Sequence, residues 1–268
     1  MEPLKLSISL IQTDILWEKP AENLIYLKKK IENIRHSDLI ILPEMFSTGF
    51  SMNVKKLAED WNGDTIKWMR KMSLNSNAVM MGSIIFKENN NYFNRLIAVF
   101  PDKSVQYYDK RHLFRLGEEH NFYKQGHSNT LIQVRGWKIN MLICYDLRFP
   151  VWSRNTNGYH MLVYVANWPS SRIQAWKTLL MARAIENQAF VAGINRVGKD
   201  GNSIRYSGES MVVDPLGKIM NDTVKNKESV ISMDLSINGL QRLRKKFPVL
   251  LDKENFSIND VVLSEEGQ

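Results

Sequence analysis

The chain has 268 residues with 44% hydrophobic and 10% aromatic side chains, a composition that builds a sizeable core and is typical of a soluble globular protein. Its formal net charge is +8, but the basic residues fall in short clusters without interleaved aromatic residues, which favours solvated helix faces over a nucleic-acid surface. No apolar run approaches the roughly 20 residues of a membrane span, no signal-peptide pattern opens the chain, and the one cysteine forms no internal disulfide, so a cytoplasmic protein is expected.

Strands and helices alternate along the first half of the chain. Residues 4–12 read as a strand, and residues 21–34 as a helix because Leu24, Leu27 and Ile31 recur at helical spacing. Residues 38–42 form a short continuous apolar run, which is typical of a strand covered on both faces. We expect further elements as a helix over 65–74 and strands over 78–86, 92–100 and 105–108.

The second half continues this alternation. A buried strand is expected over 137–144, with a helix beginning near Val151 after Pro150. The longest helix is predicted over 172–188, with Trp176 beside Leu180 on the flank of an apolar face made of Ala175, Leu179, Ala182 and Ile185. Further strands are expected over 160–166, 190–194, 207–213 and 229–235, with a turn over 214–217.

This order of elements, with hairpin-like pairs inserted, predicts an α/β layered domain rather than a helix bundle or a β sandwich. No repeat, low-complexity tract or flexible linker divides the chain. We expect residues 1–268 to form a single domain whose main body ends near Leu235. Residues 241–268 would be a C-terminal extension, with apolar Phe247, Leu250 and Leu251, that packs on the body or on a partner subunit.

Three chemically competent side chains follow short apolar runs directly or within two residues: Glu44, Lys110 and Cys144. In one sheet they would meet at the same edge, where α/β proteins bind ligands. A buried carboxylate can take the proton of a thiol, and a lysine suits the oxyanion formed when a thiolate attacks a carbonyl. Each residue alone has an ordinary explanation, as a loop carboxylate, a solvated lysine and a small buried hydrophobe. Together, and with the motifs around them, they indicate a site.

Five segments from 42 to 188 resemble the nitrilase superfamily of carbon-nitrogen hydrolases, and the resemblance covers residues 6–235. The segments are LPEMFSTGF at 42–50, YDKRHLF at 108–114, CYDLRFP at 144–150, NWP at 167–169 and ARAIENQ at 182–188. The resemblance implies a four-layer αββα sandwich with Glu44 as general base, Lys110 as oxyanion stabiliser and Cys144 as nucleophile. A further glutamate of the family corresponds best to Glu119, although the neighbouring Glu118 leaves the alignment open by one residue.

Within the superfamily the sequence looks most like the omega-amidases, which hydrolyse the terminal amides of 2-oxoglutaramate and 2-oxosuccinamate to the acid and ammonia. Arg148 lies about one helical turn past Cys144, so its guanidinium would hold the carboxylate of such a substrate bidentately. The alternative for Arg148 is a salt bridge to Asp146 or Glu186.

The other walls of the pocket are less distinctive. We expect Tyr145, Phe50 and Trp168 to contact the substrate. The remaining wall candidates are Phe46 and the segment from Ser170 through Ser171 to Arg172.

Neither a metal nor a cofactor is expected. The histidines are scattered without a pair at ligand spacing, and no glycine loop that would cradle a phosphate is present. His112 and His120 flank the lysine and glutamate segment, where a supporting hydrogen-bond role is expected.

The favoured hypothesis is an amidase for a small-molecule amide, assembled as a homodimer like members of the family. Two alternatives stay open: a hydrolase of N-carbamoyl amino acids or other small aliphatic amides, and a non-catalytic basic binding module.

Overall fold

The computed structural model describes residues 5–258, which form two β-sheets faced by helices. The first sheet has six strands in the order β13-β1-β2-β3-β4-β5, and β1, β2 and β3 run parallel. Its strands are β1 (Lys5–Gln12), β2 (Leu39–Ile41), β3 (Val79–Glu88), β4 (Asn91–Val99), β5 (Val105–Asp109) and β13 (Ser229–Ser236). Because β4 pairs antiparallel with both β3 and β5, β5 runs in the same direction as β2. The carboxyl ends of β2 and β5 therefore lie at the same edge.

The second sheet has five strands in the order β12-β9-β8-β7-β6, with β7, β8 and β9 parallel. A separate two-stranded sheet joins β10 and β11. These strands are β6 (Leu131–Val134), β7 (Trp137–Ile143), β8 (Met161–Ala166), β9 (Phe190–Asn195), β10 (Val197–Lys199), β11 (Arg205–Ser207) and β12 (Met211–Val213). The sequence pattern did not predict β6 or β10, which have only four and three residues.

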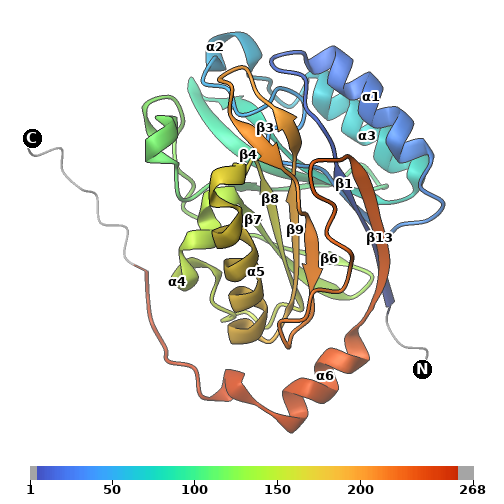
Figure 1. The fold of residues 1–268 in the computed structure, drawn as a ribbon, viewed down its shortest axis with the longest axis vertical. Helices are drawn as coiled ribbons and strands as arrows, with labels where there is room; N and C mark the ends of the chain where they lie inside the picture. Colours follow the sequence, from blue (N-terminus) through green and yellow to red (C-terminus); the bar gives the residue numbers. More distant parts are fainter. Residues whose placement is uncertain (1–4, 259–268) are drawn as a thin grey trace, which may run out of the picture.

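The two sheets pack face to face, and helices cover their outer faces (Figure 1). Helices α1 (Pro20–Glu32) and α3 (Asp64–Ser76) lie side by side over the first sheet, and α5 (Ile173–Asn187) covers the second. Strand β2 shows why both faces are apolar: Leu39 and Ile41 enter the core between the sheets, and Ile40 enters the core under α1 and α3. The expected four-layer αββα sandwich is confirmed.

The remaining helices are short. They are α2 (Val54–Leu57), α4 (Pro150–Ser153) and α6 (Ile237–Lys246). The helix expected near Val151 is thus only four residues long. It is preceded by a 3-10 helix, Cys144–Arg148, which makes the turn out of β7. In the described part of the chain, no helix is long and apolar enough to cross a membrane.

The predicted apolar face of the longest helix was partly wrong, although Ala175 and Leu179 pack against the core as half-buried residues. The face of α5 that packs on the second sheet is offset by about one residue from the predicted face. Ile185, on the predicted face, is 53% exposed. The buried residues are Trp176, Leu180, Arg183, Ala184 and Asn187. Apolar side chains recur on both sides of this helix, so helical spacing alone did not identify the face that meets the sheet.

The strand expected over 207–213 is also divided. Gly208 and Glu209 have φ values of 74° and 57°, in the left-handed region that interrupts an extended strand. Residues 205–207 therefore pair with β10, whereas residues 211–213 pair with β9. The turn expected over 214–217 is present, closed by the Gly217 N–H donating to the Asp214 carbonyl at 2.9 Å.

The C-terminal extension contacts the main body within the described residues. Arg244 of α6 donates to the carbonyl of Tyr159 at 2.6 Å and to that of Gln188 at 3.0 Å. Gln188 in turn donates to the carbonyl of Phe247 at 2.7 Å. Residues 259–268, the last part of the predicted extension, lie outside the described residues.

Candidate active site

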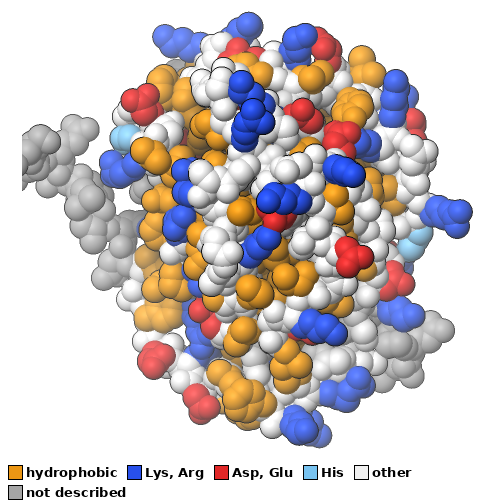
Figure 2. Space-filling view, in the orientation of Figure 1, with side chains coloured by type: hydrophobic (Ala, Val, Ile, Leu, Met, Phe, Trp, Pro, Cys, Tyr) orange, Lys and Arg blue, Asp and Glu red, His pale blue; other side chains and the backbone are white. Residues whose placement is uncertain are grey.

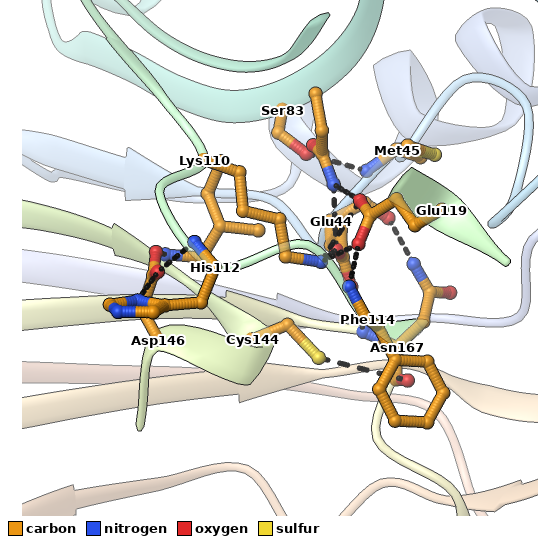
Figure 3. Close-up of polar contacts among 12 residues, drawn as sticks. Glu44, Met45, Ser83, Lys110, His112, Phe114, Glu119, Cys144, Asp146 and Asn167 are labelled. Carbon is orange, nitrogen blue, oxygen red and sulfur yellow. Dashed lines mark hydrogen bonds and ion pairs between the residues drawn. The ribbon is translucent and has the colours of Figure 1, made fainter. Parts of the chain in front are cut away.

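Glu44, Lys110 and Cys144 come together where strands β2, β5 and β7 end (Figure 3). Lys110 directly follows β5, Cys144 directly follows β7, and Glu44 comes three residues after β2. The sequence places them 66 and 34 positions apart, and the packing of the two sheets brings them to one cavity. The three side chains meet as expected, but not at the edge of one sheet. Strands β2 and β5, which precede Glu44 and Lys110, belong to the first sheet, whereas β7, which precedes Cys144, belongs to the second.

The Lys110 ammonium lies between two carboxylates that are fully buried, as it is itself. Its Nζ donates to Glu44 Oε1 at 2.8 Å and to Glu119 Oε2 and Oε1 at 2.9 and 3.1 Å. Burial acts to lower the pKa of Lys110, but the charges of Glu119 and Glu44 outweigh it and raise that pKa. Lys110 therefore stays positively charged at neutral pH.

The end of β5 is fixed by backbone contacts, so the base of the Lys110 side chain has little freedom. The Lys110 N–H donates to the Asn94 carbonyl at 3.0 Å, and its own carbonyl accepts from the Gly126 N–H at 2.9 Å. A Cβ on Gly126 would lie 2.1 Å from the Asp109 carbonyl oxygen, so only glycine fits this close approach.

Of the two neighbouring glutamates, Glu119 points into the site and Glu118 does not. Glu119 is buried, and its Oε2 accepts from the Phe114 N–H at 2.7 Å as well as from Lys110. Glu118 is exposed, with a φ of 56° that turns the chain between two short 3-10 helices, Arg115–Gly117 and Glu119–Asn121. Burial raises the pKa of Glu119, against the lowering effect of Lys110.

Two asparagines that were not among the predicted site residues hold the carboxylates in place. Asn94, in the middle of β4, donates through Nδ2 to Glu44 Oε1 at 2.8 Å and to Glu119 Oε1 at 3.0 Å. Asn167 follows β8, and its N–H donates to Glu44 Oε2 at 2.8 Å while its Nδ2 donates to the Glu44 carbonyl at 2.6 Å. Asn167 lay within a recognised motif, but nothing in the sequence distinguishes Asn94 from any polar residue in a strand.

Cys144 occupies a strained turn at the mouth of the site. Its φ is 41°, a left-handed conformation that costs a non-glycine residue of order 1–3 kcal/mol and is concentrated at functional sites. The side chain is partly exposed, and its Sγ lies 4.0 Å from the Asn167 carbonyl oxygen. Burial raises the pKa of the thiol well above its ordinary value, and the negative charge of Glu44 raises it further. The thiol is thus protonated at neutral pH and requires a base to become a nucleophile.

Asp146 and Arg183 secure the Cys144–Arg148 helix from two sides. The Asp146 carboxylate accepts from Tyr108 Oη at 2.8 Å and the Ile143 N–H at 3.0 Å, and it pairs with His112 Nδ1 at 2.8 Å. Arg183 of α5 donates to the Leu147 carbonyl at 2.6 Å. The expected supporting hydrogen bond of His112 is present, whereas His120 is exposed.

Arg148 lines the cavity. Its Cζ lies 5.1 Å from the centre of the Trp168 ring, in cation-π contact. The alternative salt bridges are not formed, because Asp146 is bound as described above and Glu186 pairs with Arg183 at 3.1 Å. No other described residue forms an ion pair with Arg148.

The cavity has a volume of about 250 Å³, which suits a small organic molecule rather than a polymer. Phe50, Tyr145 and Trp168 line it, as do Ser171 and Arg172. The expectation for Phe46 was wrong. Its side chain is fully buried under α3, with its ring centre 5.9 Å from that of Trp68, because it points to the core beneath the helices instead of the cavity.

Within residues 5–258 no group of three or more histidine, cysteine, aspartate or glutamate side chains is placed to hold a metal ion. Catalysis without a metal or other cofactor stays a prediction. On the face shown in Figure 2, lysine and arginine side chains are distributed among acidic, apolar and uncharged ones. That distribution does not form the continuous basic stripe typical of a nucleic-acid surface.

Comparison with known proteins matches the family model "Carbon-nitrogen hydrolase" to residues 7–245. The omega-amidase YafV of Escherichia coli strain K12 is 44% identical over 255 residues, which are 94% of this chain and 98% of that protein. The 2-oxoglutaramate amidase of Bacillus subtilis strain 168 is 33% identical over 255 residues, 93% of this chain and 98% of that protein. The crystal structure of XC1258 from Xanthomonas campestris, a CN-hydrolase superfamily protein with an arsenic adduct in its active site, has a TM-score of 0.93 and 43% identity. The match covers 95% of this chain and 99% of that one.

Proposed function

The chain belongs to the carbon-nitrogen hydrolase family and is an amidohydrolase, and we propose that it hydrolyses the terminal amides of small 2-oxo dicarboxylic acid monoamides, such as 2-oxoglutaramate and 2-oxosuccinamate. The observation that carries this proposal is a thiol beside a buried glutamate-lysine-glutamate group, in a small cavity that also holds an arginine with no carboxylate partner among the described residues. The cavity thus offers a nucleophile at one place and a binding group for a carboxylate at another.

In the proposed reaction Glu44 acts as general base and Cys144 as nucleophile. Glu44 takes the Sγ proton as the sulfur attacks the amide carbon, and a C–S bond forms while the carbonyl electrons move to oxygen. The Lys110 ammonium stabilises this oxyanion. When the carbonyl re-forms, the C–N bond breaks and the nitrogen takes the proton from Glu44, which releases ammonia and leaves a thioester. Water, activated by Glu44, then attacks the thioester and releases the acid and the thiol.

Glu119 has a different task in this scheme. It holds the Lys110 ammonium through both carboxylate oxygens. Because it balances the lysine charge, Glu44 can lose and regain its negative charge during the cycle without leaving Lys110 unpaired. We therefore propose Glu119 as a positioning residue.

Arg148 is proposed to bind the carboxylate at the far end of the substrate. A bidentate pair with a partly desolvated carboxylate is worth roughly 2 to 4 kcal/mol, or about 30- to 1000-fold in kcat/KM. Arg148→Ala should lower kcat/KM for 2-oxoglutaramate by that factor and leave pentanamide, an uncharged amide of the same length, almost unaffected. Arg148→Lys should lose an intermediate amount because it keeps the charge but not the two-pronged geometry. Ammonia release with both substrates measures these effects.

The comparison of two substrates makes the result specific. Equal losses for 2-oxoglutaramate and pentanamide would mean that Arg148 supports only the structure, and the substrate proposal would lose its main support. Tyr145, Phe50 and Trp168 are proposed to form the walls around the carbon chain of the substrate.

One alternative substrate class fits the same observation. N-carbamoyl amino acids also carry a carboxylate a few atoms from an amide, so Arg148 would bind them in the same way. Competition between an N-carbamoyl amino acid and 2-oxoglutaramate distinguishes the two classes. The reading as a non-catalytic binding module has no comparable support, and a gel shift with random DNA at physiological salt is expected to show no complex.

We also propose that the chain is a single domain that forms a homodimer in a cytoplasmic setting. Phe247 and Leu251, at the end of α6 and beyond it, are 63% and 82% exposed, which is typical of side chains that a partner covers. Light scattering at micromolar concentration should give twice the mass of one chain, and Phe247→Asp with Leu251→Asp should shift it towards the monomer. The control Ile25→Asp changes a residue on α1 that is 62% exposed and should leave the dimer intact. A monomer for the unmodified chain would contradict the proposal.

A further inference from the structure

Arg172 is a second arginine that lines the cavity. Both its backbone and its guanidinium group contact neighbouring residues. It ends the short 3-10 helix Ser170–Arg172 that leads into α5. Its carbonyl accepts from Trp168 Nε1 at 2.8 Å, and its Cζ lies 5.2 Å from the centre of the Phe114 ring. The Trp168 ring that contacts the Arg148 guanidinium therefore also anchors the backbone of Arg172. The two arginines belong to one packed unit.

The positive charge of these arginines is not balanced by the protein. Among the described residues, neither Arg148 nor Arg172 forms an ion pair with a carboxylate. The two acidic residues that line the cavity are Glu44 and Asp200. Glu44 is engaged by Lys110, as described above.

Asp200 is engaged as well. Its Oδ1 accepts from the N–H groups of Asn202 and Ile204 at 2.9 Å each, and its Oδ2 accepts from Tyr206 Oη at 2.8 Å. These bonds hold the loop between β10 and β11 and direct the carboxylate into that loop. Arg148 is exposed and Arg172 is half-buried, so both guanidinium groups are available at the cavity to bind an anionic, acceptor-rich ligand group.

We propose that Arg172 is a specificity-determining residue which, together with Arg148, binds the 2-oxo acid end of the substrate and rejects amides that carry an α-ammonium group there. This inference rests on the proposed function and adds a residue and a selection rule to it. A 2-oxo acid end presents only acceptor oxygens, which match the donors of two guanidinium groups. The corresponding amino acid amide, glutamine, has the same terminal amide and carboxylate but places a cation beside two other cations. Like charges that meet without an intervening acceptor are disfavoured, so glutamine is excluded even though it fits by size.

Four five-carbon amides separate the contributions: 2-oxoglutaramate, glutaramate, glutamine and pentanamide. Glutaramate keeps the carboxylate but lacks both the 2-oxo and the ammonium group, so it is the reference for each. Arg172→Gln should lower kcat/KM about 10- to 100-fold for 2-oxoglutaramate, by less for glutaramate, and not for pentanamide. In the same variant, the ratio of kcat/KM for glutaramate to kcat/KM for glutamine should fall at least tenfold. Arg172→Lys, which keeps the charge, should retain most of that preference.

Arg205→Gln is the matched control for a general change in charge. Arg205 lies on β11, is exposed and does not line the cavity, so its replacement should leave all four values unchanged. Two results in Arg172→Gln would overturn the inference. One is an equal loss of kcat/KM for all four amides. The other is an unaltered preference for glutaramate over glutamine when the variant still melts at the same temperature as the unmodified protein. Those outcomes leave the proposed function standing if turnover of 2-oxoglutaramate still depends on Arg148. If the unmodified enzyme hydrolyses none of the carboxylate-bearing amides, both the inference on Arg172 and the proposed function are wrong.

Discussion

Cys144→Ala and Cys144→Ser should abolish ammonia release, by at least about four orders of magnitude, and leave the fold intact. The loss is expected to be this large because no other cysteine is available, and a serine hydroxyl is a far weaker nucleophile with the same base. The fold should survive because Cys144 is partly exposed and the contact between its Sγ and the Asn167 carbonyl oxygen is long, at 4.0 Å. Steady-state assays and thermal melting together measure both parts.

A trapped intermediate identifies the nucleophile independently of the rate. With a slow amide substrate, mass spectrometry of the unmodified protein should find an acyl group on the peptide that contains Cys144, and none in Cys144→Ala. Near-normal ammonia release from either variant would remove Cys144 from the mechanism. The arsenic adduct in the active site of XC1258 is a property of that protein and does not replace this measurement.

Glu44→Gln should reduce kcat by roughly two to four orders of magnitude while substrate still binds, which is the usual scale for loss of a general base. The physical reason is that burial, the largest cause of the raised pKa of the Cys144 thiol, persists in the variant and keeps the thiol protonated at neutral pH. In the variant no side chain takes the proton. Below the thiol pKa the thiolate fraction rises about tenfold per pH unit, so the residual activity should increase from pH 7 to pH 9. A residual rate that is flat over this range would contradict the role of Glu44 as base.

Glu44 and Lys110 should act as a unit, because Nζ and Oε1 are 2.8 Å apart in a fully buried pair. Glu44→Gln combined with Lys110→Met is therefore expected to cost little more than the worse single change. Glu44→Gln with Lys87→Met is the matched control, since Lys87 is an exposed lysine on β3, away from the cavity, and the second change should add nothing. Fully additive losses for Glu44 and Lys110 would mean that the two residues act separately.

Much of the fold and of the candidate site follows from local sequence. Strands buried on both faces appear as continuous apolar runs, so the ends of β2 and β7 were visible, and with them Glu44 and Cys144. In β5 only Tyr108 is buried, and its end was found from the short run over residues 105–108 directly before Asp109 and Lys110. Arg148 was also predicted to share the site with Cys144, and both line the cavity from the two ends of the 3-10 helix Cys144–Arg148. Such features depend on residues that are close together in the chain, so they can be predicted from a single sequence.

Other features depended on which surfaces meet, and these only the tertiary structure decided. Ile185 and Trp176 are both apolar residues of α5, but only Trp176 faces the sheet. Glu118 and Glu119 are chemically the same, and burial next to Lys110 separates them. Asn94 became a site residue because β4 passes under two carboxylates that lie 50 and 25 positions away in the chain. The physical reason is that a buried polar group requires a partner, and the partners here are supplied by distant strands whose register no local pattern encodes.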